Sequence, residues 1–179
     1  YVTLSNLTAD GNGNLGLSDT EQAGLLFEKS NDIETNSGDV TCNYCTVSNS
    51  AGSGLMIRDS VDLWLNHLVV EDNSPSYDPI SIDNSGLTLG QQGGQVNMYD
   101  VIVRTERLGT DSGPALNINR AAAIIDTVVM YGNHTGLIWN GDNNGNFPSS
   151  LSNAQLSGST CLLLVEHTYI SGSDNVITP

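Results

Sequence analysis

The sequence predicts an all-β solenoid, in which short parallel strands stack in successive coils around a narrow apolar core. Three observations support this prediction: a bent two-strand phrase recurs, a second strand phrase follows it, and turn-forming residues fill the gaps. The 179 residues include 19 Gly, whereas aromatic residues make up 6% and all hydrophobic residues 38%. This composition suits a narrow core, and the length suits a single domain over residues 1–179.

The first phrase has the form apolar-x-apolar-x-x-apolar-x-apolar. Alternation with a period of two places side chains on one face of a strand. The double spacer resets the alternation, so both halves keep one face inward only if the chain bends between them. The apolar positions of the copies are Val2, Leu4, Leu7, Ala9; Val40, Cys42, Cys45, Val47; Leu63, Leu65, Leu68, Val70; Val96, Met98, Val101, Val103; Ala123, Ile125, Val128, Met130; and Leu163, Val165, Thr168, Ile170.

The second phrase is a single strand, often introduced by Gly, that follows each of the first five bent phrases. Its copies begin at Gly24, Gly54, Pro79, Ala115 and Gly136, with a weaker copy at 175–177. The bent phrases start 38, 23, 33, 27 and 40 residues apart, and the shortest interval fits one coil of three strands at about 3.3 Å per residue. The longer intervals predict loop insertions at residues 10–22, 28–39, 83–95, 104–114 and 140–160.

The run from Val40 to Val70, VTCNYCTVSNSAGSGLMIRDSVDLWLNHLVV, resembles the repeat of right-handed parallel β-helix proteins of the pectate-lyase-like superfamily. The resemblance covers nearly the whole chain and implies about six coils with loop insertions. An antiparallel sandwich is the competing fold, but the constant bend inside each phrase argues against it. Both ends fall within a coil, so we expect an incomplete segment of a longer solenoid, with end-to-end association through uncapped coils.

The net charge of −15 comes from 20 acidic and 5 basic residues. Such a surface repels phosphate backbones and anionic lipids, which argues against nucleic-acid and membrane-surface binding. The sequence has no apolar run of 18 residues, so no membrane insertion is expected. Together with the resemblance, these features predict a secreted or cell-surface protein.

One outward position of the second phrase forms a polar column: Glu28, Arg58, Asp83, Asn119 and Asn140. Glu28 and Asp83 would lie two rungs, or about 9.6 Å, apart, near the upper limit of the carboxylate separation in inverting glycosidases. In the resembling polysaccharide hydrolases and lyases the active cleft follows this strand face, which makes Glu28, Arg58 and Asp83 candidate catalytic residues. However, the chain lacks the close aspartates of the pectin hydrolases and the basic site of the lyases. Arg58 would also keep both carboxylates ionised, so a salt-bridged ladder without turnover is the simpler interpretation.

Candidate substrate-binding residues are the amides Asn119 and Asn140 and the aromatic residues Trp64 and Tyr77, which could stack on sugar rings. The partner would then be a polysaccharide or a cell-surface glycan. Three functions stay open: a glycoside hydrolase or lyase, a non-catalytic adhesin or binding solenoid, and a structural segment of an extracellular layer or filament. Analogy of fold alone does not choose among them.

The first insertion contains a candidate Ca²⁺ site. Alternating oxygen-bearing side chains followed by a later acid resemble calcium loops of the thrombospondin type 3 and EF-hand kinds. The loop departs from the EF-hand pattern, which has Gly where Leu15 stands, and a turn insertion without metal is the alternative. The candidate ligands are Asp10, Asn12, Asn14, Asp19 and Glu21.

Cys42 and Cys45 both face inward around one bend. They predict either small core-filling side chains or a local disulfide in an oxidising compartment, because a zinc site would need further ligands. His67 and His167 occupy the same bend position in their repeats, which predicts a role in the turn for each.

Overall fold

The computed structural model describes residues 2–10, 23–28, 40–50, 52–58, 63–71, 79–83, 95–105, 114–132, 137–140, 149–157, 163–166 and 171–178. Within these ranges every regular element is a β-strand, and every pairing between strands is parallel. The antiparallel sandwich is thereby excluded. The chain is all-β, and its parallel sheets are consistent with a β-solenoid.

The five strands of the second phrase, together with β14, form a six-stranded sheet in the order β14-β11-β9-β7-β5-β3. Each strand pairs with the next over its full length without a shift in register. The strands are β3 (Leu25–Glu28), β5 (Leu55–Arg58), β7 (Ile80–Asp83), β9 (Leu116–Asn119), β11 (Leu137–Asn140) and β14 (Leu163–Glu166).

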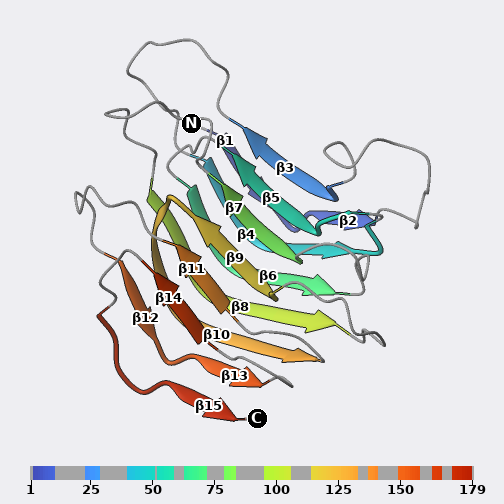
Figure 1. Ribbon diagram of the computed structural model, residues 1–179. Coiled ribbons are helices and arrows are strands. Elements are labelled where there is room, and N and C mark those ends of the chain that lie inside the picture. Colours follow the sequence, from blue (N-terminus) through green and yellow to red (C-terminus); the bar gives the residue numbers. More distant parts are fainter. Residues whose placement is uncertain are drawn as a thin grey trace.

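The first five bent phrases, together with β12, β13 and β15, form a nine-stranded sheet. Its central strands continue through the bend, whereas the outer ones are divided at it. Figure 1 shows the strands of both sheets stacked from β1 near the N-terminus to β15 at the C-terminus. The strands are β1 (Val2–Ser5), β2 (Thr8–Asp10), β4 (Val40–Ser48), β6 (Leu63–Glu71), β8 (Gln95–Thr105), β10 (Ala122–Gly132), β12 (Ser150–Ser152), β13 (Gln155–Ser157) and β15 (Val176–Thr178).

The bends share one backbone conformation. The second residue of each double spacer has a positive φ, between 52° and 58°, which is the left-handed region that turns the chain sharply. The two flanking inward positions therefore stay on the core side, as the spacing predicts. The residues at these bends are Asn6, Tyr44, His67, Asp100, Thr127, Asn153 and Asp174.

The core consists of inward columns that run across the rungs. The eight predicted inward positions that flank the bends of β4, β6, β8 and β10 are at most 1% exposed, which confirms the prediction there, whereas Leu4, Leu7 and Ala9 of the first rung are partly buried. Trp139 is also fully buried, and its indole N–H donates to the carbonyl oxygen of Ala121 at 3.3 Å. The eight are Cys42, Cys45, Leu65, Leu68, Met98, Val101, Ile125 and Val128.

A glycine introduces the first strand of the six-stranded sheet for a steric reason. A Cβ atom on Gly24 would lie 2.5 Å from a methyl carbon of Val47 and 3.0 Å from the carbonyl oxygen of Gly54. The backbone at this position packs directly against the neighbouring rung, so the chain can enter the strand only without a side chain.

The prediction for the last part of the chain is wrong. The sixth bent pair is β12 and β13, not residues 163–170, because β14 pairs with β11 in the six-stranded sheet. β15 likewise pairs with β13 in the nine-stranded sheet and is not a strand of the second type. The buried residues of this pair include Ser149, just before β12, and Ala154, between β12 and β13. The pair is therefore less apolar than residues 163–170. The range 140–160 therefore contains strands as well as an insertion.

The described residues contain no helix that is long and apolar enough to cross a membrane.

Candidate functional site

The polar column predicted on the second phrase is aligned by the backbone register of the six-stranded sheet. Glu28 pairs with Arg58, Arg58 with Asp83, Asp83 with Asn119, and Asn119 with Asn140. Glu166 of β14, which the sequence analysis had placed in another strand type, continues the same register. These six rungs extend over about 24 Å at about 4.8 Å per rung.

The described side chains of this column form an amide–carboxylate ladder. Asn119 donates from Nδ2 to Oδ1 of Asp83 at 3.0 Å, and Asn140 donates from Nδ2 to Oδ1 of Asn119 at 3.5 Å. All three residues are half-buried. From Asp83 onward, hydrogen bonds from amides form the ladder that was predicted from opposite charges. The pairing of Arg58 with its neighbours stays a prediction.

The ladder holds Asn119 in one orientation without using its full hydrogen-bonding capacity. A side-chain amide carries two N–H donors and an oxygen with two lone pairs. The bonds to Asp83 and Asn140 use one donor and one lone pair. One donor and one acceptor of Asn119 can therefore still bond to a ligand, and fixing them in advance lowers the entropy lost on binding.

The candidate sugar-binding residues do not lie together. Asn119 and Asn140 share the ladder, whereas Trp64 lies on β6 of the nine-stranded sheet, in register with Thr41 and Asn97. Trp64 is half-buried, so its ring presents only part of its surface to solvent. Tyr77 lies outside the described residues.

Of the candidate Ca²⁺ ligands, only Asp10 lies within the described residues. It ends β2, in register with Ser48, and its Oδ1 accepts a hydrogen bond from Nδ2 of Asn49 at 3.2 Å. Within the described part of the chain, no three His, Cys, Asp or Glu side chains gather as a metal site would require. Asn12, Asn14, Asp19 and Glu21 lie outside that part, so the calcium hypothesis stays a prediction.

Cys42 and Cys45 form a disulfide, which decides between the two alternatives left open by the sequence. Their Cα atoms are 6.1 Å apart, and the two residues are 0% and 1% exposed. The disulfide occupies the core positions that Leu65 and Leu68 occupy one rung away. It also closes the chain around the left-handed residue Tyr44.

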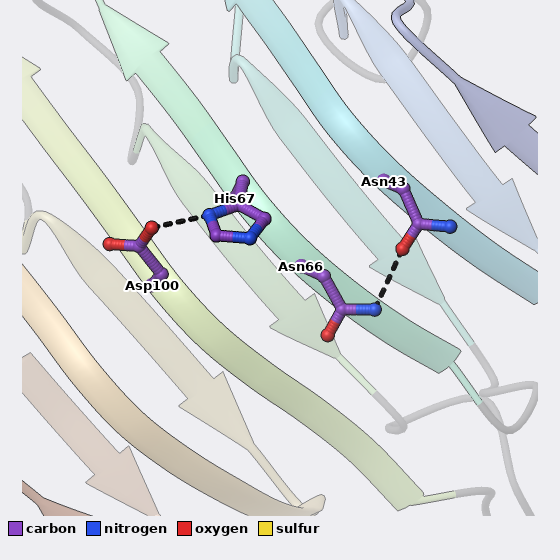
Figure 2. A network of polar contacts seen from close by, with 4 residues as sticks. All are labelled: Asn43, Asn66, His67 and Asp100. Atoms are coloured by element: carbon purple, nitrogen blue, oxygen red, sulfur yellow. Dashed lines mark hydrogen bonds and ion pairs between the residues drawn. The ribbon is translucent and has the colours of Figure 1, made fainter.

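A second group of polar and aromatic side chains lies at the bends of β4, β6 and β8, and we call it the bend ridge. The Tyr44 ring stacks on the His67 ring, with centroids 4.4 Å apart and planes 8° apart. His67 Nδ1 contacts Oδ2 of Asp100 at 2.5 Å, and Nδ2 of Asn66 donates to Oδ1 of Asn43 at 2.8 Å (Figure 2). The bend ridge comprises Asn43, Tyr44, Asn66, His67 and Asp100.

The sequence pattern predicts a turn role for His67 but does not indicate that these residues form a site. A usable signal was present, since the two spacer residues of each bent phrase must stack in register if the phrases do. Asn43–Tyr44, Asn66–His67 and Tyr99–Asp100 are the spacers of three consecutive phrases. His167 lies outside the described residues, and the bend of the sixth pair carries Asn153 instead.

No protein family, curated protein or solved structure matches this chain. The class of all-β proteins with parallel, solenoid-like sheets is therefore defined by the strand pairings alone.

Proposed function

We propose that this chain is an extracellular solenoid that binds polysaccharide or cell-surface glycan without cleaving it. The observation that carries the proposal is the ladder from Asp83 through Asn119 to Asn140 on the outer face of the six-stranded sheet. A polysaccharide is a repeating chain of hydroxyl groups, and a column of fixed amides and carboxylates offers it repeated donors and acceptors. The hydrogen-bonded ladder covers three rungs, and the backbone register continues the column over six rungs, about 24 Å, a length that suits an extended polymer rather than a small molecule.

Binding without cleavage is favoured by the order of charges in the column. A glycosidase needs one protonated carboxyl as general acid and a second carboxylate as base or nucleophile. The backbone register sets the cation Arg58 between Glu28 and Asp83, so the two carboxylates lie two rungs, or about 9.6 Å, apart, at the upper limit of the separation in inverting glycosidases. In this proposal, Glu28, Arg58 and Asp83 therefore contact the ligand and stabilise the sheet, and they do not act as catalytic residues.

We further propose that the solenoid is a right-handed parallel β-helix of about six coils, similar to the pectate-lyase-like superfamily. Parallel strands joined by crossovers are right-handed in about 98% of cases, and the constant bend in each rung fits that architecture. The buried disulfide between Cys42 and Cys45 supports an extracellular location, because disulfides form and persist in oxidising compartments.

The test is a binding screen on a panel of neutral and acidic polysaccharides, combined with an assay for new reducing ends. The full chain should bind at least one polysaccharide and release no reducing ends. Asn119→Ala should weaken that binding by about tenfold, since it removes about 1 kcal/mol or more of hydrogen bonding. Gln155→Ala, which truncates an exposed amide on the other sheet, should leave the binding unchanged.

Two results would contradict the proposal. Cleavage that is lost on both Glu28→Gln and Asp83→Asn would restore the enzyme interpretation. Absence of binding to every polysaccharide, combined with self-association of the chain, would favour the structural segment of a layer or filament.

A further inference from the structure

The bend of β4 carries a residue that the backbone conformation disfavours. Left-handed φ values are tolerated best by Gly, Asn and Asp, whereas a bulky side chain there is an outlier. The equivalent bends at Asn6, Asp100, Asn153 and Asp174 follow this preference, and His67 is also tolerated there, whereas Tyr44 with a φ of 54° and the β-branched Thr127 with a φ of 58° depart from it. Strained residues that the surrounding structure holds in place often mark functional sites.

The surroundings of Tyr44 hold its ring in place while leaving it accessible. The disulfide between Cys42 and Cys45 closes the backbone on both sides of it. One face of the ring stacks on His67, which is anchored in turn by Asp100. Tyr44 is nevertheless 60% exposed, the largest exposure among the large hydrophobic residues that the structure describes. Folding alone gains little from an aromatic ring left in water, so burial does not explain its presence.

The residues just before Tyr44 and His67 in their bends are a pair of amides with unused hydrogen-bonding groups. The bond from Asn66 to Asn43 uses Nδ2 of the former and Oδ1 of the latter. Among the described side chains, the Asn43 amide nitrogen and the Asn66 amide oxygen have no hydrogen-bond partner, and Figure 2 shows both atoms directed away from the bond between the two residues. A donor and an acceptor therefore lie at the two outer ends of this bonded pair, one spacer position before Tyr44 and His67 (Figure 2).

We propose that the bend ridge is a second glycan-binding site, which takes a neutral sugar ring. The C–H face of a pyranose stacks on the exposed part of the Tyr44 ring, and neighbouring hydroxyl groups bond to the free donor of Asn43 and the free acceptor of Asn66. The sugar is neutral because Asp100 lies on the ridge and the chain carries a net charge of −15, which repels uronic acids. The proposal rests on the proposed glycan binding for its ligand class, but it uses a different sheet and different residues.

The decisive variant is Tyr44→Asn, which installs a residue already found at the bends of two other rungs. It removes the ring and relieves the backbone strain. A structural role of the ring predicts a lower Tm, whereas a binding role predicts a lower affinity for sugar without a lower Tm. We expect affinity for a neutral oligosaccharide of glucose, mannose or xylose to fall about tenfold or more, with a Tm no lower than that of the parent. Tyr44→Phe keeps the ring and should retain the affinity, and an oligogalacturonide should bind the ridge weakly or not at all.

The same titrations separate this site from the ladder on the six-stranded sheet. In the unmodified chain, the neutral sugar should shift the NMR signals of the Tyr44 ring, assigned by their loss in Tyr44→Phe, and Asn119→Ala should not abolish those shifts. If Tyr44→Asn binds as tightly as the parent, or if the ring signals do not respond, the ridge proposal fails while the ladder proposal stands. If Asn119→Ala has no effect and Tyr44→Asn removes binding, the ladder proposal fails and the ridge proposal stands. A Tyr44→Asn variant with a clearly lower Tm would show that the ring is structural and would overturn the ridge proposal.

Discussion

Replacing Leu65 with Asp tests the inward alternation on which the whole fold depends. Leu65 is 0% exposed, and its register neighbours Cys42 and Met98 are buried as completely. Loss of the buried leucine costs about 2 kcal/mol, and an unpaired buried carboxylate adds about 3 kcal/mol or more. The total of about 5 kcal/mol reaches the lower end of the stability of a typical domain. We therefore expect Leu65→Asp to abolish cooperative folding.

The matched control is Val69→Asp in the same strand. Val69 points outward and is half-buried, so the new carboxylate stays hydrated and the change should cost about 1 kcal/mol or less. Urea titration followed by far-UV circular dichroism measures both variants against the parent. Equal destabilisation of the two variants, or a sharp unfolding transition of Leu65→Asp near the parental midpoint, would refute the assignment of faces.

Three further outcomes are expected. Replacing both Cys42 and Cys45 with Ala should lower the free energy of unfolding by about 2 kcal/mol from loss of the short cross-link alone. In the parent both residues are buried, so treatment with a mild reductant and an alkylating agent should label these cysteines only when denaturant is present. Trp139→Phe should cost about 1–3 kcal/mol in urea denaturation, since the buried carbonyl that accepts the indole N–H loses its partner, and an unchanged midpoint would contradict this bond. Calcium should raise the Tm of the parent but not of the double variant Asp10→Ala/Glu21→Ala, and a Tm insensitive to calcium would end the metal hypothesis.

The candidate site was only partly predictable. The register of the column from Glu28 to Asn140 followed from repeating one short phrase, because parallel strands stack equivalent positions. The choice between ion pairs and amide hydrogen bonds along it depended on side-chain rotamers, which periodicity does not encode. The apolar pattern does not indicate the bend ridge, because the residues of the ridge are the spacers between the apolar positions.

The sequence by itself determined the all-β class, the inward columns and the place of each sharp bend in the first five bent phrases. Its inward positions recur with a period of two that is reset by a double spacer, so they lie on one face of each strand only if the chain bends at the spacer. The tertiary structure alone decided the strand assignment after residue 140, because β14 is as apolar as a bent phrase and β12 is less so. It also decided the bond between Cys42 and Cys45 and the contact of Tyr44 with His67. Both depend on where neighbouring chain segments meet in space, which no local pattern specifies.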